Sequence, residues 1–339
     1  MTDDLMDRRS FMNAAVWTAG LGLGAMGAGV VPAMAQPAPP PGLSDNPREA
    51  GFNPLNPHHN FEIFARMQGN VAGKPGVGWY SGRVYGVVGD DQVLQPLFDL
   101  EGFGINRLER QADGSYRKFH REVGFYKDLR TGRILENWTN PFTGEIVKVA
   151  HIANDPVNSR YAPTYRMSFG EGGDAASFPF LLPWRTVDGL AMASFDVNTR
   201  WRNVLDPAIW KRESTGPWIR VSEYLQMYVK PDDLANWRNL ETIDNHGGWQ
   251  RLGPWLPWMM MGGQPGHLFY RSHTKKLPGG VDQIPPDIRA YAEKNYAKFL
   301  APPETWVEPN LTSFETYRNN NKPSERPGPT DPNWKPRGA

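Results

Sequence analysis

The chain has no cysteine among its 339 residues. This absence excludes disulfide bonds, thiolate catalysis, iron–sulfur clusters and cysteine-ligated zinc. Packing must therefore stabilise the fold, and 13 Trp, 12 Tyr and 16 Phe supply large, rigid side chains for it. Such a composition favours a core around an aromatic-lined pocket, and it fits an ordinary β-rich core equally well.

The chain also lacks a strong net charge. After its first 35 residues, which are treated below as an export signal, it lacks any long apolar run. Its 37 Lys and Arg and 36 Asp and Glu give a formal net charge of +1. This balance gives no reason to expect a nucleic-acid partner or an anionic membrane surface. No stretch after residue 35 reaches the roughly 18 apolar residues of a spanning helix, so we expect no membrane association of the mature chain.

Familiar catalytic motifs are absent after residue 35, where there is no G-x-S-x-G elbow, no H-E-x-x-H pair and no P-loop. The pattern G-x-G-x-x-G occurs at residues 22–27, inside the apolar N-terminal segment, where it predicts no dinucleotide site. The seven histidines are scattered from His58 to His273 without the spacing of metal ligands. We therefore predict no metal site and assign no cofactor.

The N-terminus has the layout of an export signal. Residues Arg8-Arg9-Ser10-Phe11-Met12 resemble the twin-arginine consensus, a small-residue apolar stretch follows, and Ala33-Met34-Ala35 forms an A-x-A cleavage site. We expect residues 1–35 to be removed by signal peptidase after passage through the twin-arginine translocase into the periplasm. The alternative, a membrane anchor, is disfavoured because the apolar stretch is Gly-rich and weakly hydrophobic. Because this route exports folded proteins, a metal or organic cofactor inserted before export stays possible.

The remaining chain divides into three parts by composition. Residues 36–72 form a Pro- and Asn-rich leader with a short helix over residues 61–67. Residues 73–318 form a single β-rich domain. Residues 319–339 are polar and Pro-rich, which is typical of a disordered tail.

The β-rich part reads as an antiparallel meander. Alternating residues separated by turn signals such as Asp113-Gly114 predict five successive strands, over residues 78–88, 96–109, 116–126, 134–139 and 145–152. Further strands are expected over residues 190–200, 218–229 and 267–275, and a helix over residues 285–302. So many strands must protect their edges, and we predict a mainly β fold that closes into a calycin-like barrel or a strongly curved sheet with a few peripheral helices.

Residues Gly78 to Asn158 resemble a bacterial family filed as domain of unknown function 1838, often with twin-arginine leaders. The likeness extends through residues 255–266 to the helix near Tyr291, and it rests on Glu101-Gly102, Arg121-Glu122-Val123, the turn Asp128 to Gly132, residues 138–144 and residues 154–158. The resemblance implies one exported domain. It implies no reaction and no catalytic residue.

Four charged or polar residues share a strand face with apolar neighbours, which predicts that they point inward. Successive side chains of a strand alternate between its faces. By this alternation the predicted catalytic residues are Arg107, Arg121, His151 and Glu223. If they converge, His151 or Glu223 could act as general base with arginine support. The alternative is a structural Arg–Glu pair and a hydrogen-bonded core histidine.

His120 and Glu122 resemble an acid–base pair, but alternation places them on the more polar face of their strand, which favours exposure to solvent. A second set is predicted to bind a ligand, because it combines strand-end polar residues with aromatic and Met side chains. This set comprises Tyr126, Trp138, Asp155, Asn158, Trp255, Trp258 and Met260. The alternative for the polar members is ordinary turn formation, and for the apolar members ordinary core packing.

These features predict an exported protein that binds a small apolar or aromatic molecule in a β-barrel pocket. Three classes of function stay open. The first is a cofactor-independent isomerase, lyase or hydrolase, the second is a non-catalytic ligand carrier, and the third is a metal-dependent oxidoreductase. Inward polar residues that meet at one point would favour the enzyme, and a smooth apolar cavity would favour the carrier.

Overall fold

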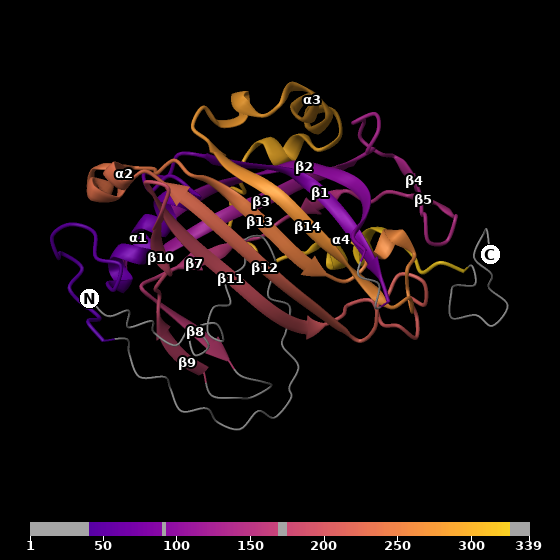
Figure 1. Cartoon of the computed structure of the whole chain (residues 1–339), viewed down its shortest axis with the longest axis horizontal. Helices are drawn as coiled ribbons and strands as arrows, with labels where there is room; N and C mark the ends of the chain where they lie inside the picture. The colour runs from indigo at the N-terminus through magenta and orange to yellow at the C-terminus, as the bar shows by residue number, and fades with distance from the viewer. Residues whose placement is uncertain (1–40, 90–92, 169–174, 326–339) are drawn as a thin grey trace.

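The computed structural model describes residues 41–89, 93–168 and 175–325, so the expected signal peptide lies outside it. The fold is mainly β, with one large antiparallel sheet and a few helices (Figure 1). In spatial order the strands of this sheet are β10 (Trp184–Val187), β11 (Leu190–Arg202), β12 (Trp218–Val229), β13 (His246–Gly253), β14 (Gly266–Leu277), β1 (Gly76–Val88), β2 (Gln95–Arg110), β3 (Tyr116–Lys127) and β6 (Ile152–Asn154), with β7 (Ser159–Tyr161) also paired to β3.

The predicted meander is confirmed for its first three strands. β1, β2 and β3 pair antiparallel in sequence order, and Gly114, with a φ of 83°, forms the turn between β2 and β3. The next two predicted strands leave the sheet. β4 (Asn137–Thr139) and β5 (Ile146–Lys148) pair only with each other, as do β8 (Thr164–Ser168) and β9 (Ala175–Pro179).

The sequence analysis predicted no strand at β13, where the adjacent glycines Gly247 and Gly248 weaken the strand signal. In the structure this segment pairs with both β12 and β14. Gly247 permits the pairing, since a Cβ atom at this position would lie 1.7 Å from the Gln226 carbonyl oxygen. Here glycine marks close approach of two backbones rather than a loop.

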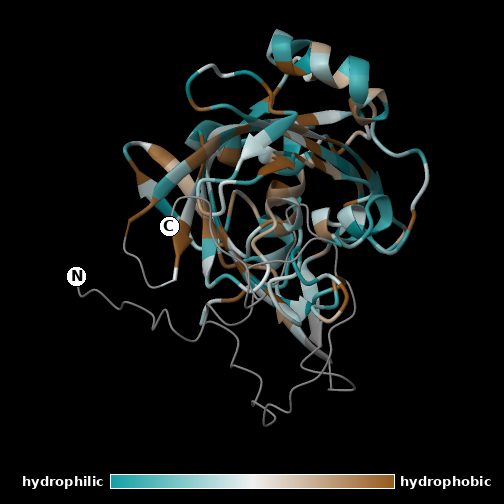
Figure 2. Cartoon of the chain, turned by 90° about the vertical axis from the view of Figure 1, so that its right-hand side faces the viewer, coloured by the Kyte–Doolittle hydropathy of each residue, from teal (hydrophilic) through white to brown (hydrophobic). Residues whose placement is uncertain are grey.

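The expected closure into a barrel is not observed. The pairings among the described residues form an open path that ends at β10 on one side and at β6 and β7 on the other. The coarser prediction, a mainly β antiparallel fold with few helices, is confirmed. Figure 2 shows hydrophobic and hydrophilic colours changing along the strands, as expected where each face contacts different elements.

Helix α1 (Pro57–Gln68) lies against the face of the sheet that we call the inner face. The Phe64 ring is 5.3 Å from that of Phe195 on β11 and 5.2 Å from that of Tyr161 on β7. These strands belong to opposite flanks of the sheet, so the inner face is concave around the helix. The short helix predicted over residues 61–67 is thus confirmed and is longer at both ends.

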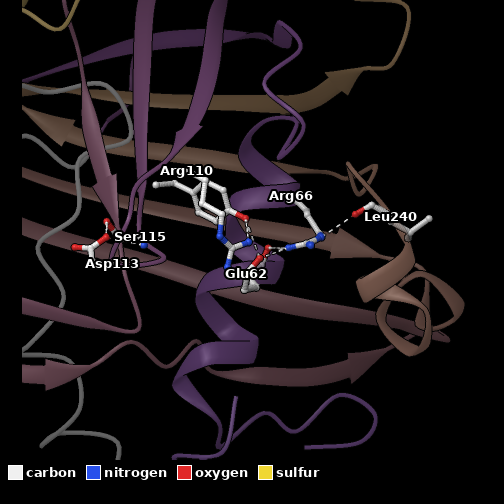
Figure 3. Close-up of polar contacts among 7 residues, drawn as sticks. Glu62, Arg66, Arg110, Asp113, Ser115 and Leu240 are labelled. Carbon is white, nitrogen blue, oxygen red and sulfur yellow. Dashed lines mark hydrogen bonds and ion pairs between the residues drawn. The ribbon is translucent and has the colours of Figure 1, made fainter. Parts of the chain in front are cut away.

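The buried carboxylate of Glu62 links α1 to strands β2 and β3. Its partner Arg66 links the same helix to the segment that contains Leu240. Glu62 accepts hydrogen bonds from Arg66 at 2.5 Å, from Arg110 at 2.9 Å and from the Tyr116 hydroxyl at 3.1 Å (Figure 3). Arg66 also donates through Nε to the Leu240 carbonyl oxygen at 2.8 Å. The network satisfies the buried charge of Glu62, which would otherwise oppose folding.

The opposite, outer face is covered over β1 to β3 by α3 (Pro286–Asn295) and the 3-10 helix η4 (Ala297–Leu300), which together correspond to the predicted helix near the C-terminus (Figure 1). The other short elements are α2 (Pro231–Ala235), α4 (Ser313–Asn320), η1 (Trp237–Asn239), η2 (Pro257–Met259) and η3 (Gly280–Gln283). Of the predicted C-terminal tail, residues 326–339 lie outside the described part. None of the helices in the described ranges has the length and apolar character needed to cross a membrane.

We predict that Phe64→Ala lowers the free energy of unfolding by about 3–5 kcal/mol, because Phe64 is 3% exposed and joins both flanks of the sheet. Urea unfolding followed by tryptophan fluorescence measures the change. The matched control is Ile209→Ala, whose side chain is 59% exposed and should leave stability unchanged. Equal stability of the two variants would contradict the role assigned to α1.

Candidate functional site

A belt of polar side chains crosses the inner face of the sheet at mid-strand, between two apolar clusters. Beside α1 the inner face is apolar, with residues such as Leu108, Met227 and Phe195. Near the other strand ends it is apolar again, with residues such as Leu100, Val221 and Leu268. The polar belt between them consists of Glu223 on β12, Arg251 on β13, Ser272 on β14, Tyr80 on β1, and Lys118, His120 and Glu122 on β3.

A cavity of about 160 Å³ lies where the polar belt meets the C-terminal end of α1. Its polar walls include Lys118, His120, Glu122 and Tyr80, and the other polar lining residues are Gln68, Asn106, Asn245, Thr274, Lys275 and Lys276. Its apolar walls include Met67, Leu225, Met227 and Trp249. The cavity therefore combines apolar surface with a few convergent polar groups, the usual make-up of a small-molecule site.

The expectation that His120 and Glu122 face solvent is wrong. His120 is 8% exposed and Glu122 lines the cavity, because both faces of β3 are covered by protein. α1 and strands β12 and β13 cover the inner face, whereas η4 and the segment that follows it cover the outer face. Alternation shows which residues share a face, but it cannot show which of two covered faces contains the site.

Glycines on the inner face of β2 and β3 make room for the polar side chains. A Cβ atom on Gly104 would lie 2.3 Å from His120 Nε2. A Cβ atom on Gly124 would lie 2.3 Å from the Tyr80 hydroxyl oxygen, and one on Gly102 would lie 2.7 Å from it. The glycines thus set the depth at which His120 and Tyr80 sit against the sheet.

Glu122 has the environment of a tuned acid–base group. It accepts a hydrogen bond from Asn154 Nδ2 at 3.1 Å and also lies beside the Tyr80 hydroxyl. The pKa of Glu122 is raised to about 7, chiefly by burial; the Asn154 hydrogen bond opposes the rise, and the neighbouring charge of Glu223 contributes to it. Near neutral pH this carboxyl group therefore exchanges between its acid and base forms.

Glu223 and Arg251 form the next part of the polar belt. Arg251 Nε lies 3.6 Å from Glu223 Oε1, and burial raises the pKa of Glu223 although Arg251 opposes the rise. Within the described residues, Glu223 Oε1, Arg251 Nε and Ser272 Oγ are buried without a hydrogen-bond partner. Glu223 and Arg251 thus compensate each other's charge at a distance beyond a normal hydrogen bond, and buried polar atoms without such a bond are rare in folded proteins.

Lys118 and His120 complete the row on β3. Lys118 is 4% exposed, and burial lowers its pKa to about 8, with Glu122 opposing the fall. Burial and then the charge of Lys118 lower the pKa of His120 well below its usual range, so the ring is neutral at pH 7. His120 is thus a neutral ring on the same face of β3 as Lys118 and Glu122.

Of the four predicted catalytic residues, only Glu223 belongs to the polar belt. Arg107 and Arg121 point to the outer face, so the prediction that they support a base from the interior is wrong. Arg107 lies 4.2 Å over the Phe119 ring and donates to the Glu304 carbonyl oxygen. Arg121 pairs with Asp155 at 2.9 Å and holds the segment after η4 through carbonyl oxygens.

His151 lies apart from the polar belt, because β5 and β6 are separated by a non-strand segment rather than forming one strand. Its Nδ1 accepts a hydrogen bond from the Tyr126 backbone N–H at 3.3 Å. Together with Tyr126, Trp258 and Met260, it lines a second groove of about 610 Å³ between β5, η2 and α4.

The other predicted ligand residues have structural contacts. Trp138 and Trp255 lie in the apolar cluster at the far end of the inner face. Asn158 accepts a hydrogen bond from the His120 backbone N–H at 3.1 Å and donates to the Val307 carbonyl oxygen. Asp155 pairs with Lys298 at 2.9 Å as well as with Arg121.

Residues 41–89, 93–168 and 175–325 contain no group of three His, Asp or Glu side chains placed to hold a metal ion. These residues therefore offer no set of metal ligands for the metal-dependent oxidoreductase that the sequence analysis left open.

Comparison with known proteins gave one family. A family model described as "Protein of unknown function (DUF1838)" matches residues 73–321. The matched range contains every strand of the sheet and the polar belt, whereas α1 precedes it. A search of the curated proteins found no match.

We predict that Glu122→Gln stabilises the protein at alkaline pH. The pKa of Glu122 is raised, so the stabilisation from its bound proton is complete below the ordinary value of 4.5 and is lost as the pH rises through about 7. The permanently neutral Gln does not lose it. The variant should match the wild type near pH 5 and exceed its free energy of unfolding at pH 8 by on the order of 2 kcal/mol.

Urea unfolding at the two pH values measures this difference. Glu304→Gln, at an exposed position, is the control and should show no pH-dependent difference from the wild type. A Glu122→Gln variant that is less stable than the wild type at pH 8 would show that the carboxylate is a structural group.

Proposed function

The chain belongs to the DUF1838 family, whose description names no activity, and we propose that it is a cofactor-independent isomerase or lyase acting on a small carbonyl compound. The observation that supports this proposal best is the position of Glu122 in the wall of the cavity, on the same strand face as Lys118 and His120, where burial raises its pKa to about 7. A general base is most effective when its pKa lies near the working pH.

The proposed reaction begins with removal of a proton from the carbon next to the substrate carbonyl. Glu122, as carboxylate, accepts this proton, and negative charge develops on the carbonyl oxygen. The Lys118 cation is the group of the cavity that stabilises such charge. Return of the proton to another carbon gives an isomer, and loss of a group from the β-carbon gives an elimination product.

The apolar walls of the cavity favour a substrate with a small hydrocarbon part. Met67, Leu225 and Met227 line the cavity beside the polar row of β3. A non-catalytic carrier, the alternative from the sequence, would use the same cavity, but it would not require a carboxyl group that exchanges its proton near neutral pH.

We also propose that the protein works in the periplasm after export through the twin-arginine translocase. The support is the sequence alone, namely Arg8-Arg9 before an apolar stretch and the Ala33-Met34-Ala35 cleavage site.

Deuterium exchange tests the proposed reaction without knowledge of the natural substrate. The protein is incubated in D₂O with a panel of small aldehydes, ketones and 2-oxo acids, and NMR follows loss of the proton signal next to the carbonyl. We expect exchange that Glu122→Gln slows by about 10²–10⁴-fold, and a wild-type rate that rises as the pH passes 7.

Glu304→Gln should exchange at the wild-type rate, because this side chain lies outside the cavity. Saturation-transfer signals for a bound compound without any exchange would identify a carrier. Exchange that is equal in the wild type and in Glu122→Gln would refute the proposed base.

Export has its own test. The double variant Arg8→Lys, Arg9→Lys should stay in the cytoplasm of a bacterial host that has the twin-arginine translocase, with residues 1–35 retained. Cell fractionation and intact mass would show this, whereas the wild type and an Arg48→Lys control should yield periplasmic protein that begins at Gln36. Periplasmic, processed double variant would overturn the proposed route.

A further inference from the structure

We propose that Lys118 is a nucleophile that forms a Schiff base with the carbonyl carbon of a small aldehyde or ketone in the cavity. This inference rests on the proposed function, since it names the substrate class and a covalent step for the same site. It assigns to Lys118 a role that a purely electrostatic cation would not have.

Two lysines are buried on the inner face, and their contacts differ sharply. Lys276 donates to the Arg66 carbonyl oxygen at 2.5 Å and to the Gly69 carbonyl oxygen at 2.6 Å, so it closes the C-terminal end of α1. Lys118 Nζ donates one hydrogen bond within the described residues, to Gln68 Oε1 at 3.4 Å. Both lysines line the cavity, and burial lowers the pKa of both. They differ in what holds them, because two carbonyl oxygens fix the Lys276 amine, whereas the Lys118 amine has one longer contact.

The surroundings of Lys118 favour the neutral, nucleophilic amine. Lys118 is 4% exposed, so its ammonium form is poorly solvated, and the charge of Glu122 opposes this effect. The second buried lysine, Lys276, lines the same cavity and does not favour a further positive charge there. Burial lowers the pKa of Lys118 to about 8, so at pH 7.5 its neutral fraction is on the order of 100-fold larger than that of an ordinary lysine. Desolvation in an apolar pocket is a common way to activate a lysine toward carbonyl groups.

The polar belt supplies the proton transfers that this step needs. The Lys118 nitrogen forms a bond to the carbonyl carbon, and the carbonyl oxygen leaves as water. One hydrogen of that water comes from the amine and the other from the Glu122 carboxylic acid. The product is a protonated imine and a Glu122 carboxylate.

The same groups then perform the proposed proton removal. The Glu122 carboxylate takes the proton from the carbon next to the imine, and the electron pair moves into the protonated imine to give a neutral enamine. Return of the proton followed by addition of water releases the product and restores the amine. No oxidant, reductant or metal takes part, and the acid and base forms of Glu122 are each used in turn.

The size of the cavity limits the substrate. Its volume of about 160 Å³ is close to that of an engineered cavity of ~150 Å³ that accommodates benzene. A compound of about six heavy atoms or fewer would fit beside the Lys118 amine. This limit favours small aldehydes, ketones and 2-oxo acids over sugars or steroids.

Reductive trapping tests the proposal on the wild-type chain. The protein is incubated at pH 7.5 with glycolaldehyde, acetone or pyruvate and sodium cyanoborohydride, which reduces an imine to a stable secondary amine. Digestion and mass spectrometry then locate the modified lysines. We expect Lys118 to be modified by at least one compound about tenfold faster than Lys294, which is exposed and lies outside the cavity, and Lys276 to stay unmodified. Modification of Lys118 no faster than that of Lys294 would overturn the proposal.

Two variants separate this inference from the proposed function. In Glu122→Gln, trapping at Lys118 with loss of deuterium exchange would support both statements. In Lys118→Met, checked for folding by circular dichroism, loss of exchange supports the Schiff base. Exchange at the wild-type rate in Lys118→Met would refute the Schiff base and leave Glu122 as a base acting on the free carbonyl compound.

Discussion

Helix α1 packs into the concave inner face of an open sheet, and its aromatic side chains connect strands from both flanks of that sheet. The helix has 12 residues, which corresponds to about 18 Å. Strands β3, β12 and β14 each have 12 residues, which corresponds to about 40 Å. The helix therefore covers only part of the inner face. The far end is filled by large aromatic side chains, among them Trp255 and Trp258. The polar belt and the cavity occupy the space between these two packed ends.

This arrangement explains why charged groups persist in the interior. Apolar packing on both sides removes water from the belt, and desolvation is the largest cause of the pKa changes at Glu122, Glu223 and Lys118. Burial of such groups costs stability, since each must give up its hydration for incomplete pairing. Glu223 Oε1, Arg251 Nε and Ser272 Oγ have no hydrogen-bond partner among the described residues, so the hydration that these atoms lose on folding is not fully replaced.

The sequence predicted the elements better than their arrangement. Turn residues and alternation located β1, β2, β3, β11, β12 and β14 closely, because these signals are local. Closure of the sheet and the position of β4 and β5 depend on contacts between residues far apart in the chain, which periodicity does not encode.

The site was misplaced for the same reason, because the side of the sheet that contains the cavity is also set by long-range contacts. Arg121 and Glu122 are neighbours on β3, and both faces of this strand are covered, so an apolar partner such as Val123 did not identify the face with the cavity. A usable signal was present, since Gly102, Gly104 and Gly124 alternate on the face that contains His120 and Glu122. Glycines at alternate strand positions indicate that bulky groups approach that face.

Lys118, His120 and Glu122 hold fixed positions relative to one another because they lie on one strand, β3. β3 pairs with β2 along its length and with β6 and β7 on its other side, so its backbone is fixed by hydrogen bonds on both edges. Residues two and four apart on such a strand keep constant spacing and direction, unlike residues on loops. Tyr80 is held to the same frame, because its hydroxyl donates to the Val123 carbonyl oxygen at 3.3 Å and its ring crosses the glycines of β2 and β3. The amine, the imidazole, the carboxyl group and the phenol are thus positioned by the sheet itself. Acid–base chemistry at this site would then require only proton movements and no rearrangement of the backbone.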